Sequence, residues 1–315
     1  MGRSVVKSGT RPRVIPSDAT FSVIAPASFA HPDRVSEGMK ALRARGFHLK
    51  PAEHAHMRGP LFFAGTREQR LGDFHAAFAD ESTQAVMSLR GGYGSNYLLD
   101  GLDLELIRSH PKPFFAYSDL TGLQLHLLDR LGLPAFHGPM LAADFASEGG
   151  VHLPTFQDAL AGRLYSVGAG EGLRTLKTGT ARGRLYGGCL SILVSLLGTS
   201  WEPATEGKLL FLEDTGVKPY QVDRMLWHLK QAGKLHDVRG IIFGEMLDCA
   251  SPGAAPELLE QVIASAFEDF DGPVAMGLRS GHVSRANVTL TFGVEAELHT
   301  GDAPELRFLE PAVQR

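Results

Sequence analysis

The chain has 315 residues, of which 43% are hydrophobic and 21% are charged, and its formal net charge is −4 at pH 7. This is the composition of an ordinary globular protein, and the length exceeds that at which single hydrophobic cores stop growing, so we expect two domains. The acidic balance and the lack of a basic stripe argue against nucleic acid as a partner, and no apolar run approaches the roughly 18 residues of a membrane span. We therefore expect no membrane partner and a cytoplasmic location.

The first half of the chain alternates predicted strands with predicted helices. Strands are expected over residues 20–26, 47–49, 86–89 and 112–117, and helices over 33–45, 65–80 and 122–131. Thr66 and Gln69 have the spacing of a capping box at the start of the second helix. Because strands that alternate with helices form parallel sheets, we predict an α/β fold with a parallel-sheet N-terminal domain, residues 1–150.

The pattern weakens in the middle of the chain and then resumes. Glycines gather in residues 151–178, which predicts a linker. The remaining residues, 179–315, predict a smaller, mixed α/β C-terminal domain. Its helices are expected over 190–197, 220–232 and 256–267, its strands over 208–212 and 238–243, and a closing hairpin over 288–292 and 294–298 with Gly293 at a turn or a bulge.

A glycine-rich turn follows one of the predicted strands. Residues 87–96 read MSLRGGYGSN, so an apolar run leads through three glycines to Ser95, and apolar residues typical of a helix follow. A serine on a strand-to-helix turn, with glycines that allow close backbone approach and free helix amides beside it, has the features of a nucleophile elbow. Gly94 directly precedes Ser95, unlike in G-x-S-x-G, so a phosphate-binding loop and a plain tight turn stay open as alternatives.

A serine hydroxyl becomes a good nucleophile when a base takes its proton, and the base is usually a histidine oriented by a carboxylate. Of the 13 histidines, His282 lies in a loop with little apolar character before the predicted hairpin. Glu213 follows the apolar run 209–212, at the carboxyl end of a predicted strand, where α/β folds place their chemistry. An exposed loop histidine and a helix-capping Glu213 are the alternatives.

Seven short motifs occur in a recognisable order. They are APAS at 25–28, AGT at 64–66 with Arg70, RGGYGS at 90–95, YSDLT at 117–121, HGPM at 137–140, LED at 212–214 and GH at 281–282. Together they resemble the LD-carboxypeptidases, the murein tetrapeptide carboxypeptidase family of serine peptidases. The resemblance implies an N-terminal domain of flavodoxin/glutamine-amidotransferase-like architecture, and a homodimer.

The resemblance also implies a catalytic triad and a reaction. Ser95 is the implied nucleophile, Glu213 the orienting carboxylate and His282 the general base, with the active site between the two domains. The implied reaction is hydrolysis, through an acyl-enzyme, of the amide between the L-centre of a diamino acid and a C-terminal D-amino acid in murein tetrapeptides. It serves peptidoglycan recycling and uses neither a metal nor a cofactor.

The tetrahedral intermediate and the substrate carboxylate each need a binding group. We expect the backbone amide of Asn96, with that of Gly91 or Gly92, to stabilise the developing oxyanion. Arg90 or Arg285 is the candidate for binding the terminal carboxylate.

Two other functions fit parts of the pattern. A related branch, the microcin-immunity hydrolases, uses a similar triad on peptidyl or aminoacyl nucleotides, although the Tyr93–Gly94 pair before the serine favours the carboxypeptidase branch. A ligand-binding α/β protein would use the glycine turn to hold a phosphate without turnover, but it leaves Glu213 and His282 unexplained.

Overall fold

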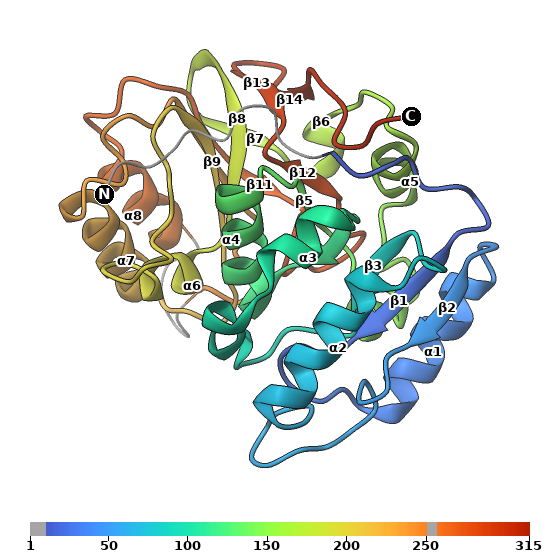
Figure 1. Ribbon diagram of the computed structural model, residues 1–315. Helices are drawn as coiled ribbons and strands as arrows, with labels where there is room; N and C mark the ends of the chain where they lie inside the picture. The colour runs from blue at the N-terminus through green and yellow to red at the C-terminus, as the bar shows by residue number, and fades with distance from the viewer. Residues whose placement is uncertain (1–10, 251–256) are drawn as a thin grey trace.

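A computed structural model describes residues 11–250 and 257–315 of the chain. These residues form two β-sheets with helices around them (Figure 1). The first sheet is parallel apart from one edge strand, and the second mixes parallel and antiparallel pairs, so the predicted α/β class is confirmed. Within the described residues, no helix is both long enough and apolar enough to cross a membrane.

The first sheet has the strand order β12-β5-β4-β3-β1-β2. Its strands are β1 (Thr20–Ile24), β2 (His48–Pro51), β3 (Ala85–Ser88), β4 (Phe114–Ala116), β5 (Ala135–His137) and β12 (Leu290–Phe292). Strands β1 to β5 are parallel, and β12 runs antiparallel to β5. Because the carboxyl ends of parallel strands meet at one edge, β3, β4 and β5 deliver the residues that follow them to the same place.

Four helices connect these strands, namely α1 (Pro32–Arg43), α2 (Arg67–Ala79), α3 (Leu104–Ser109) and α4 (Thr121–Leu131). Helix α2 begins as predicted. The Thr66 hydroxyl accepts a hydrogen bond from the Gln69 amide at 3.2 Å, and the Gln69 side chain accepts one from the Thr66 amide at 2.9 Å. This capping box satisfies two amides that the helix itself leaves unpaired.

The second sheet has the strand order β6-β14-β13-β8-β9-β10-β11-β7. Its strands are β6 (Ser166–Gly168), β7 (Arg174–Lys177), β8 (Gly179–Cys189), β9 (Lys208–Glu213), β10 (Gly240–Gly244), β11 (Val274–Leu278), β13 (Glu295–Thr300) and β14 (Glu305–Phe308). The helices of this half are α5 (Leu153–Ala161), α6 (Leu190–Ser195), α7 (Pro219–Gln231) and α8 (Leu258–Ala266). The predicted helix 256–267 starts at a residue outside the described ranges.

The segment expected to be a linker, residues 151–178, contains α5, β6, the 3-10 turn Ala169–Glu171 and β7. Strands β6 and β7 form the two edges of the second sheet. They are short, and most of their residues are exposed or half-buried, so their sequence carries little periodicity. We propose that the chain divides into two domains. In this division, residues 151–178 supply both edge strands of the second sheet, and β12 returns to the first sheet.

The closing hairpin predicted around Gly293 is wrong. Strand β12 pairs with β5 in the first sheet, whereas β13 pairs with β8 and β14 in the second. Gly293 therefore carries the chain from one sheet to the other. Alternating side chains show that a segment is a strand but not which strand it pairs with, so the pattern could not reveal this crossing.

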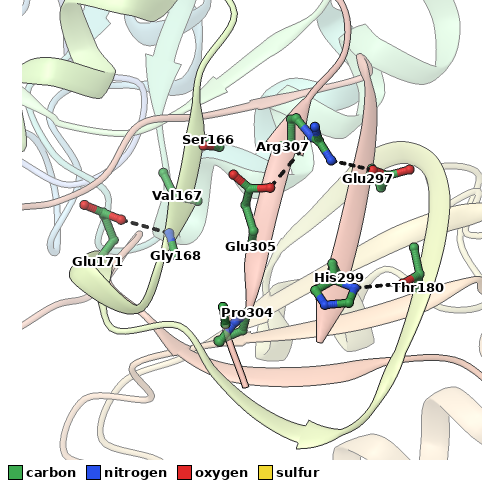
Figure 2. A pocket seen from close by; sticks show the side chains of 11 residues that line it. Ser166, Val167, Gly168, Glu171, Thr180, Glu297, His299, Pro304, Glu305 and Arg307 are labelled. Atoms are coloured by element: carbon green, nitrogen blue, oxygen red, sulfur yellow. Dashed lines mark hydrogen bonds and ion pairs between the residues drawn. The ribbon is translucent and has the colours of Figure 1, made fainter. Parts of the chain in front are cut away.

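An open hollow of about 550 Å³ lies on the outer strands of the second sheet (Figure 2). Its polar side chains form hydrogen bonds with one another. Arg307 donates to Glu297 at 2.8 Å, and His299 and Thr180 share a hydrogen bond of 2.9 Å. Ser95, Glu213 and His282 do not line it. The hollow is thus separate from the predicted site.

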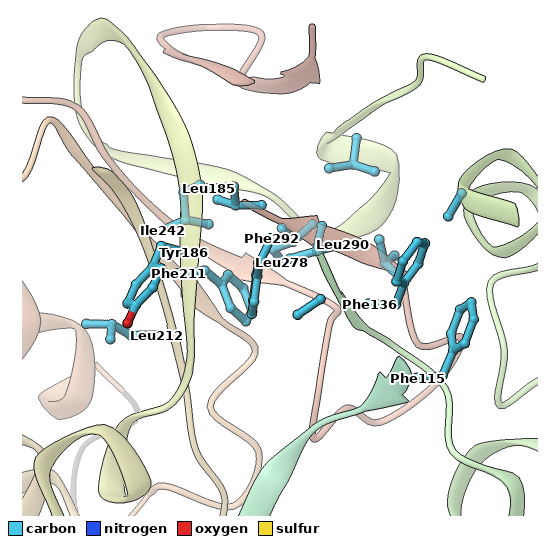
Figure 3. Close-up of a cluster of buried hydrophobic side chains, with 14 of the residues drawn as sticks. Phe115, Phe136, Leu185, Tyr186, Phe211, Leu212, Ile242, Leu278, Leu290 and Phe292 are labelled. Atoms are coloured by element: carbon cyan, nitrogen blue, oxygen red, sulfur yellow. The ribbon is translucent and has the colours of Figure 1, made fainter. Parts of the chain in front are cut away.

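One hydrophobic core joins the two sheets (Figure 3). Phe115 and Phe136 of the first sheet belong to the same buried cluster as Phe211 of the second. Phe292 of β12 packs between them, with its ring centre 6.1 Å from that of Phe211. Complete burial of each such ring stabilises the fold by about 2–3 kcal/mol. The shared core fixes the position of one sheet edge relative to the other. A site that takes residues from both sheets requires this.

Candidate active site

The glycine turn after β3 has the sharp geometry expected of an elbow. Gly94 has a φ of 108°, and a Cβ there would lie 2.3 Å from the Phe63 ring, so only glycine fits without rearrangement. Ser95 begins a 3-10 helix, Ser95–Gly101, and α3 follows it, so the helix expected after the elbow is present in the 3-10 form. The tighter 3-10 turn is common where a chain connects two elements over a short distance.

A buried arginine holds the turn in place. The Nη1 of Arg70 donates to the carbonyl oxygens of Pro26 and Gly94, both at 2.8 Å, and its guanidinium lies over the Phe63 ring. The Ser28 hydroxyl accepts the Tyr93 amide at 3.1 Å. These contacts explain why the APAS motif and Arg70 accompany the glycine turn in the sequence.

Ser95 is fully buried and bonded twice to Asp119. Its amide donates to Asp119 Oδ2 at 2.8 Å, and its hydroxyl donates to the Asp119 carbonyl oxygen at 2.6 Å. Asp119 lies three residues after the end of β4 and follows Ser118, whose φ of 65° is unusual for a residue with a side chain. In the described structure the Ser95 hydroxyl makes no hydrogen bond to His282.

Glu213 and His282 form a buried pair. Glu213 is the last residue of β9, and its Oε2 accepts both the amide of His282 at 3.0 Å and the ring Nδ1 at 2.7 Å. Gly281 has a φ of 87°, and a Cβ there would lie 2.6 Å from the Glu213 carboxyl carbon. The glycine before the histidine therefore allows the loop to reach the carboxylate.

Each member of this pair favours the charged form of the other. Burial lowers the pKa of His282, but the charge and hydrogen bond of Glu213, with smaller effects of Asp214 and Asp144, outweigh it and raise the pKa above 6.5. Burial alone would raise the pKa of Glu213, but His282 and His137 reverse the effect and lower it. The geometry therefore favours a carboxylate beside an imidazole that gains a proton readily.

The segment 117–119 connects the serine to the histidine. The ring of Tyr117 meets that of His282 edge to face, with the ring centres 5.2 Å apart, while Asp119 holds Ser95. The Tyr117 hydroxyl donates to Asp144 Oδ1 at 3.4 Å. Burial raises the pKa of Asp144 to about 6, against the hydrogen bonds of the Met140 amide, Asn287 and Tyr117. The three predicted residues thus gather around one short loop.

The predicted substrate-binding groups differ in exposure: Gly92 is exposed, Asn96 is half-buried and Gly91 is buried. Arg90 and Arg285 are exposed, and in the described part of the chain neither makes an ion pair or a hydrogen bond. The amides of Gly91 and Gly92 donate to no protein acceptor in the same residues, whereas the Asn96 side-chain oxygen is buried without a partner. The two exposed arginines are therefore free to meet a ligand.

Sequence reasoning missed the contacts of Tyr117, Asp119, His137 and Asp144. The motifs YSDLT and HGPM contain three of these residues, but nothing in their spacing indicates what the side chains touch.

Within the described residues, no group of three or more histidine, cysteine, aspartate or glutamate side chains is arranged to hold a metal.

The α/β fold brings a serine on a strand-to-helix turn and a carboxylate–histidine pair to one loop, an arrangement typical of a serine hydrolase. Comparison with family models identifies the family. Residues 22–138 match the LD-carboxypeptidase N-terminal domain, and residues 182–298 match the LD-carboxypeptidase C-terminal domain. The chain belongs to the LD-carboxypeptidase family and is a serine-type carboxypeptidase.

Three relatives illustrate the range of similarity. The probable murein peptide carboxypeptidase of Bacillus subtilis is 35% identical over 308 residues, which are 95% of each chain. The solved muramoyltetrapeptide carboxypeptidase of Oxalobacter formigenes is 27% identical with a TM-score of 0.81, over 93% of this chain and 99% of that one. The microcin C7 self-immunity protein MccF of Escherichia coli is 27% identical over 309 residues, 87% of this chain and 88% of its own. A solved structure of MccF shares the fold, with a TM-score of 0.89 at 23% identity over 96% of this chain and 99% of that one.

Proposed function

We propose that this protein hydrolyses the amide between the L-centre of a diamino acid and a C-terminal D-amino acid in murein tetrapeptides. Two of the relatives described above carry names that specify carboxypeptidase activity on murein peptides. The observation that carries the proposal is the hydrogen bond of 2.7 Å between His282 Nδ1 and Glu213 Oε2. It fixes the ring tautomer that a general base needs.

The proposed mechanism uses Ser95, His282 and Glu213 as a triad. With its Nδ1 proton held by Glu213, His282 has a free Nε2 that can take the proton of the Ser95 hydroxyl. Ser95 then attacks the scissile carbonyl, and His282 passes the proton to the leaving amine of the D-amino acid. Glu213 stabilises the imidazolium between these steps. A water molecule then attacks the acyl-enzyme while His282 takes its proton, and His282 returns that proton to the Ser95 oxygen as the acyl bond breaks.

Ser95 must change its contacts before it reacts. Its hydroxyl donates a hydrogen bond to the Asp119 carbonyl oxygen, and its side chain has no exposed surface. Rotation about the Cα–Cβ bond of Ser95 frees its hydroxyl. The exposed rings of Tyr93 and Tyr97, on either side of Ser95 in the sequence, form the part of the turn that substrate meets first. We propose that substrate binding accompanies both changes.

Two further contacts complete the proposal. The unpaired amides of Gly91 or Gly92, with that of Asn96, stabilise the oxyanion. Arg90 or Arg285 binds the terminal carboxylate, since an exposed guanidinium without a protein partner can form a bidentate pair with it. The structure favours neither arginine over the other.

An alternative substrate class is a peptidyl or aminoacyl nucleotide, as in microcin immunity. The similarity to MccF over most of both chains supports it, and the same triad would serve. A non-catalytic ligand-binding role has no support comparable to the Glu213–His282 pair.

The test offers the purified protein a synthetic murein tetrapeptide and, separately, an aminoacyl-sulfamoyl adenosine, and follows each by mass spectrometry. Conversion of the tetrapeptide to a tripeptide, with the adenosine compound intact, supports the proposal. Cleavage of the adenosine compound alone would assign the immunity function instead, and binding of either compound without turnover would assign a ligand-binding role.

Three properties of the working enzyme extend the proposal: a place in peptidoglycan recycling, action in the cytoplasm, and a homodimeric state. The first two are what the resemblance to the LD-carboxypeptidase family implies. Sedimentation of the purified protein tests the homodimer, and a monomer at micromolar concentration would contradict it.

A further inference from the structure

His137 lies beside the triad residues without belonging to them. It is the last residue of β5, in register with Ala116 of β4 and Leu290 of β12. Its ring packs against Phe211 at 5.2 Å and Phe292 at 5.1 Å between ring centres, and its side chain has no exposed surface. The ring is therefore fixed at the junction of the two sheets.

Two polar atoms face each other there without a partner. His137 Nε2 lies 3.9 Å from Glu213 Oε1, and in the described structure neither atom makes a hydrogen bond. The other oxygen of Glu213 takes both donors from His282. A buried carboxylate oxygen without a donor is costly, and 3.9 Å is only about 1 Å longer than a normal hydrogen bond.

The contacts of Ser280 determine where the protons of the His137 ring can lie. The Ser280 hydroxyl donates its single proton to the Val288 carbonyl oxygen at 2.8 Å, so its oxygen accepts the Nδ1 proton of His137 at 3.0 Å. A His137 ring protonated on Nδ1 alone would turn a nitrogen lone pair toward Glu213 in a site closed to solvent. With Nδ1 already donating to Ser280, a second proton on Nε2 gives the facing carboxylate oxygen its donor.

We propose that His137 is a positioning residue that donates its Nε2–H to Glu213 Oε1, so that Glu213 is held between two histidines. The inference rests on the proposed function, because it assigns His137 to the same triad. His282 fixes one oxygen of the carboxylate and His137 the other, so the carboxylate cannot rotate away from His282. The donor also draws negative charge away from the oxygen that binds His282, which keeps that imidazole available as a base.

Other charged and titratable groups face this pair from the surrounding elements. They are Tyr117 after β4, Asp144 in the segment 141–145, Cys189 at the end of β8 and Asp214 after β9, and the charge of Arg90 after β3 acts on Tyr117. Substitution of His137 leaves all of them in place. A change in the pH dependence of a His137 variant therefore reports the loss of the imidazole itself.

The test compares two substitutions at this position. In His137→Gln the amide nitrogen replaces Nε2 and still donates to Glu213, whereas in His137→Asn it replaces Nδ1 and leaves Glu213 Oε1 without a donor. We expect His137→Asn to lower kcat on tetrapeptide about 10- to 100-fold with little change in KM, as for a buried charged acceptor that loses its donor. His137→Gln should stay within about fivefold of the wild type.

The pH profile separates positioning from a merely structural role. Without the His137 donor, more of the negative charge of Glu213 acts on His282 and raises its pKa. The acid limb of the kcat/KM profile should therefore move to higher pH, by about half a pH unit or more, in His137→Asn. In His137→Gln the limb should not move. An unmoved limb in His137→Asn, or equal losses of activity in the two variants, would overturn the proposal.

NMR of the wild-type protein tests the same point without a substitution. Long-range proton–nitrogen spectra should show a proton on Nε2 of His137, and a ring protonated on Nδ1 alone would overturn the proposal. The proposed function fails separately, if the wild type releases no D-amino acid whatever the state of His137. If the wild type is active and Ser95→Ala is not, wild-type behaviour of His137→Asn would contradict the positioning role alone.

Discussion

The hydroxyl of Ser95 donates a hydrogen bond of 2.6 Å to the backbone carbonyl of Asp119, and the Asp119 side chain accepts the Ser95 amide in return. A single residue therefore holds the proposed nucleophile through both its main chain and its side chain. Because Tyr117, two residues earlier, contacts His282, this loop determines how Ser95 and its base lie relative to each other.

The Asp119 side chain should therefore be required for the position of Ser95. Asp119→Ala leaves the buried Ser95 amide without an acceptor, which should cost about 1–3 kcal/mol of unfolding free energy and lower kcat. Asp119→Asn retains an acceptor oxygen and should keep most of both. Urea unfolding and steady-state kinetics measure the two quantities, and identical behaviour of the two variants would contradict this role.

Activity and stability should respond to pH through His282 in opposite directions. Its pKa in the folded protein lies above the ordinary 6.5, and the base must be neutral, so kcat/KM should rise with pH through a value above 6.5. The Glu213–His282 pair stabilises the fold fully below pH 6.5, and this contribution is lost as pH rises through the folded pKa. Unfolding experiments across this range should show the loss in the wild type and not in His282→Gln. A wild-type acid limb below pH 6.5 would contradict the assignment.

Gly281 should tolerate no side chain. Gly281→Ala combines a positive φ with a clash against the Glu213 carboxyl group, and should cost about 2–4 kcal/mol together with most of the activity. Gly233→Ala is the matched control, because Gly233 has a φ of 71° with nothing within 4 Å of the added carbon. It should cost only about 1 kcal/mol and leave activity unchanged. Equal effects in the two variants would mean that the clash with Glu213 is unimportant.

Arg70 and Arg67 lie on the same helix but should differ in importance. Arg70→Met removes the donor of two buried carbonyl oxygens beside the elbow, and should cost about 2–3 kcal/mol and lower kcat. Arg67→Met removes an exposed contact with Asp100 and Tyr97, worth about 1 kcal/mol or less. Thermal unfolding with activity assays compares them. If Arg70→Met kept wild-type kcat, the elbow would not depend on this clamp.

Local sequence signals predicted much of the fold. The capping box at Thr66, the strand that ends before the glycine turn and the strand that ends at Glu213 all depend on neighbouring residues, and all are present. The pairing of β12 with β5 and the place of β6 and β7 at the sheet edges depend on partners 97 to 157 residues away. Periodicity contains no information about such partners, so these features could not be predicted.

The same distinction applies to the site. Ser95, Glu213 and His282 could be singled out from the residues around them, since each comes directly after an apolar run or beside a glycine. Whether they meet depends on how the two sheets pack, and their motifs alone do not show it. His137 and Asp119 were part of motifs as well, but their contacts with Glu213 and Ser95 arise only in the folded chain.

The account is tested most directly by following the release of D-alanine from synthetic murein tetrapeptide by the wild-type protein and by Ser95→Ala. The wild type should convert the tetrapeptide to the tripeptide with one D-alanine released per molecule. Ser95→Ala should lose a factor of about 10⁴ or more in kcat, with an unfolding free energy within about 1–2 kcal/mol of the wild type. An intact tetrapeptide after incubation with the wild type, or D-alanine released by Ser95→Ala at a comparable rate, would contradict the assignment of Ser95 as the nucleophile of an LD-carboxypeptidase.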